Sequence, residues 1–262
     1  MTGLAALPMY DWPEIRPASD ALWAAIRDQL LLRGIAAPAV LDRGDQMEAL
    51  WTDPDLVLSQ TCGYPFATRL AGRVALVATP AHAATGARPG RYYSVLVARR
   101  TDGPVSAGDL AGRRFAFNMR HSQSGFAAPV RLLLAGGHSS QPKPLETGAH
   151  RASIRAVATG EADWAAIDAV TWQLALRHEP AAETLRVFAV SPETPALPLI
   201  TSLRHAADAP AIADAVEAAI AGLDAAIRKQ LLLTGLVRLN PQDYAPLAAS
   251  FDARRCLPSL PA

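Results

Sequence analysis

Short apolar runs recur along the chain, each bounded by polar or turn-forming residues. Runs of this length are typical of buried β-strands. The predicted strands are Leu4–Tyr10, Leu56–Ser59, Val74–Ala78, Tyr92–Ala98, Arg113–Phe117, Trp164–Ile167 and Leu185–Val190.

Between these runs, apolar residues recur at the three- and four-residue spacing of a helix face. The helices that this spacing predicts are Leu22–Leu30, Val130–Leu134, Ile154–Ala158 and Ile212–Ile227. Ser19 or Asp20 is the expected N-cap of the first helix, and Gly235 is expected to end the last. Strands that alternate with helices predict parallel pairing in an α/β fold.

Two strand-like segments, near Tyr93–Ala98 and Val190–Pro198, flank a self-contained β-α-β block. This plan is expected when one α/β lobe is inserted into another and two strands join them. We therefore expect a discontinuous first lobe of residues 1–97 and 192–262, and an inserted second lobe of residues 98–191. Lobes of this kind bind a ligand between them and close like a hinge.

Charge and composition exclude several classes of protein. The chain has 25 Lys and Arg against 24 Asp and Glu, a net charge of +1. This balance offers no electrostatic surface for nucleic acid or for a membrane. No apolar stretch approaches the roughly 20 residues that span a bilayer, so membrane insertion is not expected. Cys62 and Cys256 are too few for a disulfide framework and are more typical of isolated thiols.

The first residues of the chain bear on its compartment. The segment Met1–Glu14 has no basic region, because the first arginine is Arg16, and Pro8 interrupts its apolar run. It does not have the pattern of a secretory signal. We therefore expect a cytoplasmic protein, or a periplasmic one if the sequence is truncated.

The segment Asn118–Pro129 carries the strongest chemical signal. It leads from a predicted strand through the turn Ser122-Gln-Ser-Gly125 into a predicted helix. The free N–H groups and positive dipole end of a helix start favour an anion, and small hydroxyls add donors. One serine would serve as an ordinary N-cap, but two serines followed by glycine favour anion contact. If Ser124 is the cap, Pro129 lies beyond the first turn and predicts a distorted start to the helix.

Two further candidates follow this turn. His150 precedes the predicted helix at Ile154 and could donate an N–H to an anion, or be only a cap or a solvent-facing residue. Asp168 ends a predicted strand. It could face a ligand, or cap the next helix through the N–H of Val170 or Thr171.

An enzymatic alternative uses the same residues. Ser124, His150 and Asp168 are the ingredients of a hydrolase triad. The chain, however, has no Gly-x-Ser-x-Gly elbow, Walker loop, Gly-x-Gly-x-x-Gly turn or His-Glu-x-x-His motif. The histidines are scattered singly, and neither cysteine has metal-ligand spacing. We therefore expect a binding protein without catalysis, cofactor or metal, with a cytoplasmic enzyme or a ligand sensor as the alternative.

Taken in order, several segments resemble the phosphonate-binding, PhnD-like branch of the type 2 periplasmic binding proteins, the solute receptors of ABC importers. The matching segments are the opening strand up to Tyr10, Leu56–Tyr64, Tyr92–Val97, Asp109–Phe117, Ser122–Gly125, Gly148–His150 and Ala162–Asp168. The resemblance implies two α/β lobes joined by two hinge strands, with a ligand cleft between the lobes.

The resemblance also implies the ligand and the site. In that family the Ser-x-Ser-Gly turn and the Gly-x-His segment hold phosphonate or phosphate oxygens, and an acidic residue at the position of Asp168 can face a ligand amine. Trp172 would add an indole to the cleft, and Arg120 or Arg151 could supply charge or merely face solvent. The candidate ligand-binding residues are Ser122, Gln123, Ser124, Gly125, His150, Asp168, Tyr10, Gln60, Thr61 and Tyr93.

The expected function is recognition of a small oxyanion such as phosphate, phosphite or a phosphonate. An ABC permease is the expected macromolecular partner. We expect a monomer or a weak dimer.

Overall fold

A computed structural model describes residues 3–83, 86–102, 110, 112–136, 142–251, 253 and 257. The chain forms two compact units, one of residues 1–91 and 195–248 and the other of residues 92–194 and 249–262. The expected lobe boundaries differ from these by three to six residues, and residues 249–262 join the second unit. Cys256, the start of the segment at Asp109 and the final prolines lie outside the described residues.

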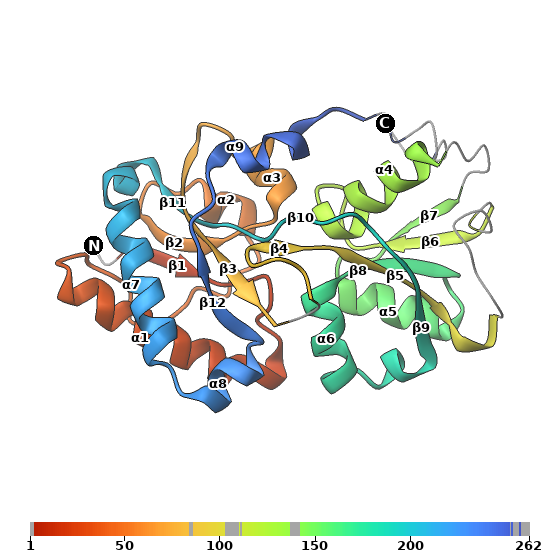
Figure 1. The fold of residues 1–262 in the computed structure, drawn as a ribbon, viewed down its shortest axis with the longest axis horizontal. Coiled ribbons are helices and arrows are strands. Elements are labelled where there is room, and N and C mark those ends of the chain that lie inside the picture. Colours follow the sequence, from red (N-terminus) through yellow and green to blue (C-terminus); the bar gives the residue numbers. More distant parts are fainter. Residues whose placement is uncertain are drawn as a thin grey trace. The chain divides into compact units, whose positions relative to one another are not determined.

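Unit 1 is built on a five-stranded sheet of order β1-β2-β11-β3-β12 (Figure 1). Its strands are β1 (Leu4–Ala6), β2 (Leu56–Gln60), β3 (Val74–His82), β11 (Leu199–Ser202) and β12 (Leu233–Val237). β1 and β2 are parallel, whereas β11 is antiparallel to β2 and β3, and β12 is antiparallel to β3. The predicted parallel pairing is therefore found between β1 and β2, whereas the other described pairs of this sheet are antiparallel.

The helices of unit 1 bury apolar faces against this sheet and against one another. They are α1 (Arg16–Leu32), α2 (Met47–Trp51), α3 (Gly63–Ala67), α7 (Ala209–Gly222), α8 (Ala225–Gln230) and α9 (Pro241–Tyr244). α1 packs on α7, which also contacts β3 and β12. Trp23, Ile26 and Leu30 recur on the buried side of α1.

Two predicted helix boundaries in unit 1 are wrong. α1 begins at Arg16, with a proline in its first turn, so Ser19 and Asp20 lie inside the helix and do not cap it. The long C-terminal helix is two helices, because the chain turns after Gly222 and Asp224 caps α8 through the N–H of Ala226. Gly235 lies in β12.

Unit 2 has a second five-stranded sheet, of order β7-β6-β8-β5-β9. Its strands are β5 (Ser94–Arg99), β6 (Arg114–Phe117), β7 (Lys143–Glu146), β8 (Trp164–Asp168) and β9 (Leu185–Val190). β7, β6 and β8 are parallel, and β5 is antiparallel to both β8 and β9. Aromatic rings fill the core of this unit: Phe115 stacks on Trp164 with centroids 4.1 Å apart.

Three helices accompany this sheet, α4 (Ala128–Ala135), α5 (His150–Thr159) and α6 (Ala169–His178). A π-helical turn, Gln123–Ala127, runs directly into α4. Gly160, with a φ of 83°, ends α5 in the left-handed conformation that favours glycine. The short strands β4 (Arg91–Tyr92) and β10 (Thr194–Pro195) pair with each other and contain two of the points where the chain passes from one unit to the other.

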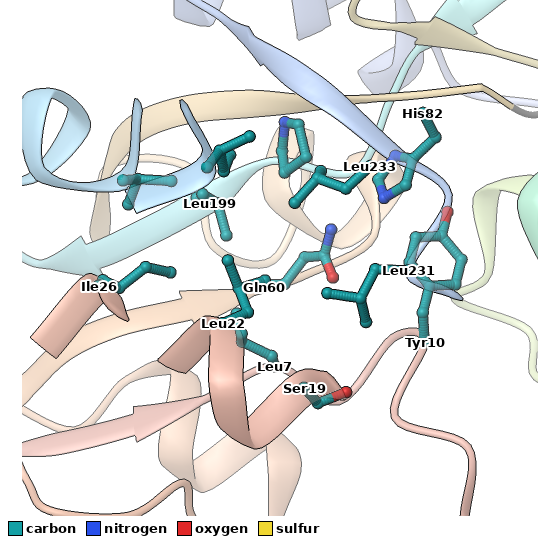
Figure 2. Close-up of a pocket in the computed structure, with 13 residues that line it drawn as sticks. Leu7, Tyr10, Ser19, Leu22, Ile26, Gln60, His82, Leu199, Leu231 and Leu233 are labelled. Atoms are coloured by element: carbon teal, nitrogen blue, oxygen red, sulfur yellow. The ribbon is translucent and has the colours of Figure 1, made fainter. Parts of the chain in front are cut away.

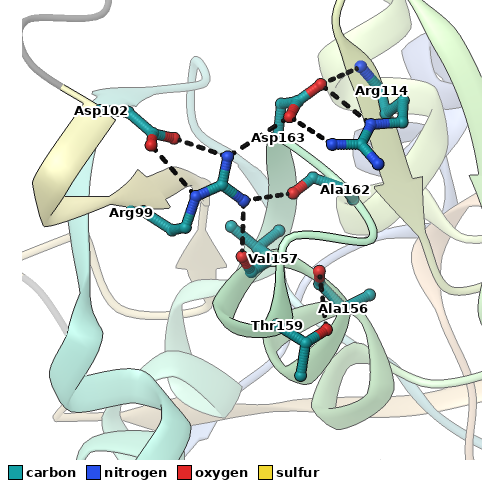
Figure 3. Close-up of polar contacts among 8 residues, drawn as sticks. All are labelled: Arg99, Asp102, Arg114, Ala156, Val157, Thr159, Ala162 and Asp163. Atoms are coloured by element: carbon teal, nitrogen blue, oxygen red, sulfur yellow. Dashed lines mark hydrogen bonds and ion pairs between the residues drawn. The ribbon is translucent and has the colours of Figure 1, made fainter.

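An ionic network closes one edge of unit 2 (Figure 3). Asp163, just before β8, accepts hydrogen bonds from the Arg114 backbone N–H at 2.8 Å and from its guanidinium at 2.9 Å. Arg99, at the end of β5, donates to Asp163 at 3.3 Å and to the carbonyl groups of Val157 and Ala162 at 2.8 and 2.7 Å. The network therefore joins the start of β6, the end of β5 and the last turn of α5.

Within the described residues, no helix is both long and apolar enough to cross a membrane.

Candidate anion-binding site

The strand directions of unit 2 bring several polar residues to the edge opposite the ionic network. β6 and β8 run parallel, so Asn118 and Asp168 both lie at carboxyl ends. β5 runs the other way, and its first residue Ser94 pairs with Asp168. The sheet thus delivers Asn118, Asp168 and Ser94 to one edge.

The serine turn predicted from the sequence begins the helix that follows this edge. Ser122 is the N-cap, and its Oγ accepts a hydrogen bond of 3.0 Å from the Gly125 N–H. The π-helical turn confirms the predicted distortion ahead of Pro129. Ser122, Gln123 and Ser124 are each at most 3% exposed. The start of this helix is therefore buried and carries polar side chains.

Ser124 and His150 come from different helices and meet at this helix start. Ser124 Oγ lies 3.0 Å from His150 Nε2. His150 is the first residue of α5, and burial of its ring lowers its pKa to about 4, although the nearby Ala166 carbonyl favours the charged form. Its Nδ1 is buried, and none of the described residues makes a hydrogen bond of ordinary geometry with it. At neutral pH the imidazole is therefore an uncharged group with one N–H.

Position 125 requires glycine, because the side chains of Asn118 and His150 pack against it. A Cβ at this position would lie 2.0 Å from Asn118 Oδ1 and 3.0 Å from His150 Cε1. Asn118 is 7% exposed, and its Oδ1 is buried with no hydrogen-bond partner among the described residues. The Asn118 carbonyl also accepts from the Gly148 N–H at 2.8 Å, which anchors the loop before α5. Asn118 therefore connects the two elements that carry Ser124 and His150.

Ser94 holds the serine turn from the sheet side. Its Oγ donates to the Ser124 carbonyl at 2.8 Å, and its backbone N–H donates to Ser191 Oγ at 2.9 Å. Both serines are buried. The turn is thus fixed by β5 and by the segment after β9.

Asp168 caps α6, as the simpler interpretation predicted. Its Oδ1 accepts from the N–H of Val170 at 2.7 Å and of Thr171 at 3.0 Å. Tyr93 is half-buried next to this cap, and its carbonyl accepts from the Ala169 N–H at 3.1 Å. The structure therefore brings Asp168 and Tyr93 to the same edge as the serine turn, and their ligand contact stays a prediction.

The hydrolase alternative fails on this geometry. A triad needs a carboxylate that accepts from the histidine Nδ1. His150 Nδ1 has no such partner among the described residues, and one oxygen of Asp168 is engaged by the start of α6. Ser124 and His150 therefore form a hydrogen-bonded pair without an acidic third member.

The two candidate arginines are engaged elsewhere. Arg151 donates to Glu179 at 2.7 Å, and Arg120 lies 3.6 Å from Glu146. Another arginine reaches the serine turn, since Arg131 Nη1 lies 3.4 Å from Gln123 Oε1 and donates to it. The other groups of the turn and its His150 partner are hydroxyls, backbone N–H groups and an uncharged imidazole.

The candidates of unit 1 lie in or beside a separate pocket (Figure 2). Tyr10 and Gln60 both line it, and Figure 2 shows the Gln60 amide among apolar side chains. Tyr10 packs edge-on to His82 with ring centroids 5.1 Å apart. Thr61 follows Gln60 and is fully buried, with no hydrogen-bond partner for its Oγ1 within the described residues. Sequence reasoning thus found two of the polar groups in this pocket.

Asn118, Ser94 and His82 were not predicted as site residues from the sequence. Asn118 and Ser94 carry no local signal, because their importance arises from contacts with Gly125 and Ser124 on other elements. The position of Asn118 directly after a predicted strand was the one available indication. Trp172, expected to line a cleft, is 6% exposed on α6.

Comparison with known proteins gives a family match. The family model described as "ABC transporter, phosphonate, periplasmic substrate-binding protein" matches residues 5–244. No curated protein is significantly similar to the chain.

Solved structures share the fold at low sequence identity. PhnD1 of Prochlorococcus marinus, in complex with methylphosphonate, is 17% identical, with a TM-score of 0.72 over 94% of this chain and 96% of that one. XAC2383 of Xanthomonas citri, bound to ATP, is 16% identical, with a TM-score of 0.71 over 95% and 96%. A binding-protein component of a phosphonate ABC transporter (PA3383) of Pseudomonas aeruginosa is 18% identical, with a TM-score of 0.67 over 93% and 83%. The predicted type 2 periplasmic-binding-protein fold is confirmed.

The family match corrects one expectation. The matched family is periplasmic, so a periplasmic location is indicated and the predicted cytoplasmic location is wrong. That prediction relied on the first residues of the sequence, which do not determine the compartment. The family is a substrate-binding component of transporters, which confirms the expectation that the protein is not an enzyme.

Proposed function

Because the chain belongs to the family of periplasmic phosphonate-binding proteins of ABC transporters, we propose that it binds a phosphonate-type oxyanion at the serine turn of unit 2. The observation that carries this proposal is the pairing of Ser124 with His150 at a buried helix start. Family membership implies a small-molecule ligand and a permease partner.

The chemistry of the turn favours a tetrahedral anion. The N–H groups at the start of the π-helical turn and the helix dipole attract negative charge. Ser122 and Ser124 can turn their hydroxyl hydrogens towards the anion, and the Gly125 backbone leaves room beside them. In a buried site these hydrogen bonds to a charged acceptor are stronger than in water.

The remaining candidates have supporting roles in this proposal. Gln123 offers a backbone N–H in the first turn, while Asp168 and Tyr93 would face the part of the ligand away from the phosphorus. Tyr10, Gln60 and Thr61 would contact the ligand from unit 1. We expect the protein to act as a monomer or weak dimer, which size-exclusion chromatography with light scattering can measure.

The experiment that tests the proposal is calorimetry with phosphate, phosphite, methylphosphonate, 2-aminoethylphosphonate and sulfate. We expect at least one phosphorus oxyanion to bind and to raise the melting temperature. A ligand at 100 times its Kd adds about 2.7 kcal/mol to the free energy of unfolding. Absence of binding to every phosphorus oxyanion at millimolar concentration would refute the proposal.

A further inference from the structure

The serine turn of unit 2 depends on support from outside its own helix. In its π-helical part the N–H of Ala127 donates to the carbonyl of Ser122 at 2.9 Å, five residues back in the chain. Pro129 has no N–H to continue this pattern at the Ser124 carbonyl, and Ser94 Oγ from β5 donates there at 2.8 Å. Helical turns of this type are rare and occur mostly at functional sites. The turn therefore keeps its shape through contacts with other elements.

The end of the chain is one of those elements. Residues 249–262 return to unit 2 after the last stretch of unit 1. We call the described residues of this stretch, 249–251, 253 and 257, the C-terminal segment. Leu257 is fully buried in the aromatic core of unit 2, and Phe251 and Ala253 pack against the same core. Burial of these apolar side chains holds the segment on unit 2.

Phe251 of this segment packs on a residue of the π-helical turn. Its ring lies 6.4 Å, centroid to centroid, from the ring of Phe126, the residue after Gly125. Phe126 is 4% exposed, and its ring also packs on Phe117 of β6 with centroids 4.9 Å apart. Aromatic rings at these distances attract one another beyond the burial of their surface. Phe126 is thus anchored both by the sheet and by the C-terminal segment.

Arg131 connects the same segment to the first residue of the π-helical turn. From α4, its Nη2 donates to the Ala249 carbonyl at 3.0 Å, and its guanidinium carbon lies 4.7 Å from the centre of the Phe251 ring. Its Nη1 donates to Gln123 Oε1 at 3.4 Å. Gln123 is 1% exposed and begins the π-helical turn. Because a guanidinium is attracted to the face of an aromatic ring, this one side chain holds the segment and the turn together.

We propose that the C-terminal segment positions the serine turn for its anion, with Phe251 and Arg131 as the positioning residues. This inference rests on the proposed function, because the turn is the proposed anion site. Without these contacts Phe126 and Gln123 lose partners, and the turn gains conformations in which its donors no longer converge. The apparent affinity for the anion then falls by the fraction of molecules that keep the binding conformation.

Calorimetry with methylphosphonate compares Phe251→Ala with the wild type. We expect about two- to tenfold weaker binding, the range that corresponds to the free energy of one aromatic pair. Phe251→Tyr keeps the ring and should bind as the wild type does. Leu110→Ala is the control for stability, because Leu110 is 1% exposed in the same core but belongs to neither the segment nor the turn. This control should lose stability and keep its affinity.

Arg131→Lys separates positioning from charge. Lysine keeps the positive charge, but one ammonium group cannot reproduce the guanidinium contacts with Ala249, Phe251 and Gln123 together. We expect this variant to weaken methylphosphonate binding as Phe251→Ala does, and it serves alone if Phe251→Ala does not fold. Arg177→Lys, at an exposed arginine in the last turn of α6, is the matched control and should leave affinity unchanged.

Hydrogen exchange of the ligand-free protein gives a readout that does not depend on binding. The Ala127 N–H forms the π-helical hydrogen bond to Ser122, so its exchange reports opening of the turn. Phe251→Ala and Arg131→Lys should speed this exchange by a factor similar to the loss of affinity. Amides in the middle of β5 and β8 should be affected less.

The outcomes separate positioning from general stability and from the proposed function. Weaker binding with faster Ala127 exchange, and affinity kept in Leu110→Ala, supports the proposal. Wild-type affinity in folded Phe251→Ala and Arg131→Lys overturns it, and so does an equal loss of affinity in Leu110→Ala. If the wild type binds no phosphorus oxyanion, the proposed function fails, and Ala127 exchange alone then decides whether the segment holds the turn.

Discussion

Ser124 Oγ and His150 Nε2 lie 3.0 Å apart, so these two side chains share one hydrogen bond. If His150 accepts this bond, Ser124 presents only lone pairs to its surroundings. If His150 donates, the Ser124 hydroxyl is free to donate to an anion. Donation from the Ser124 hydroxyl to an anion therefore requires the tautomer of His150 that carries its hydrogen on Nε2, or a protonated imidazole.

Replacing Ser124 with alanine removes the central donor of this arrangement. We expect Ser124→Ala to weaken phosphonate binding by about 1–3 kcal/mol, as measured by calorimetry, because a charged acceptor loses a buried hydrogen bond. Ser202→Ala is the matched control: Ser202 is also a buried serine, but it lies in β11 of unit 1. Equal affinity of wild type and a folded Ser124→Ala variant would remove Ser124 from the site.

Adding one methyl group at Gly125 should disrupt the site sterically. In Gly125→Ala the new Cβ would overlap Asn118 Oδ1, so Asn118 and His150 must move. Overpacking of this kind costs roughly 1–3 kcal/mol of unfolding free energy, and anion affinity should fall with it.

Gly222→Ala is the control for the glycine substitution. Nothing lies within 4 Å of a Cβ at Gly222, which ends α7. Alanine there should leave affinity unchanged and hold or slightly raise the melting temperature. Urea denaturation and calorimetry of both variants measure the difference, and a Gly125→Ala protein that binds normally would contradict the close packing described above.

Protonation of His150 should oppose folding in mild acid. The folded-state pKa of about 4 lies below the ordinary value of 6.5, so the unfolded chain takes up the proton first. Stability contributed by the neutral ring is complete above pH 6.5 and is lost as the pH falls towards 4. His150→Gln should therefore flatten the decline in unfolding free energy between pH 6.5 and 4, whereas His205→Gln should not.

A bound anion should raise the pKa of His150, because negative charge next to the ring favours its charged form. NMR titration of the imidazole with and without methylphosphonate measures this change. A pKa that stays the same on saturation with ligand would place the anion away from His150.

Asp163 should govern acid stability at the opposite edge of unit 2. Its pKa is lowered to about 2, chiefly by the hydrogen bond from Arg114, so the stabilisation is present above about pH 4 and lost as the pH falls through 2. We expect Asp163→Asn to cost about 1 kcal/mol at pH 7, since the partly exposed pair is screened by solvent. The gap between variant and wild type should close at pH 2 in urea denaturation, and Asp214→Asn on the surface should show no such gap.

Local patterns predicted most strands and the start of the anion site. The runs ending at Phe117, Asp168 and Val190 became β6, β8 and β9 almost unchanged, because their apolar residues are buried by neighbouring strands. β12 was missed, since Leu233–Val237 is a strand through its pairing with β3, and nothing near it in sequence shows that partner.

Residues of the candidate site that act through contacts distant in sequence could not be predicted either. Ser122 and Gly125 could be identified from a turn motif read in sequence order. Asn118 and Ser94 could not, because their roles arise where β5, β6 and the π-helical turn meet in space. The sequence allowed the carboxylate of Asp168 either to face a ligand or to cap the next helix. Only its distances to the N–H groups of α6 show that it caps this helix.

The ionic network at the far edge of unit 2 holds in place the elements that carry the serine turn. Arg99 and Asp163 hold β5, β6, β8 and α5 together at the ends remote from the serine turn. Those elements are therefore ordered before any ligand arrives, and little entropy is lost in forming the site on binding. A frame preorganised in this way should select its ligand by shape, because it cannot readily expand to fit a larger anion.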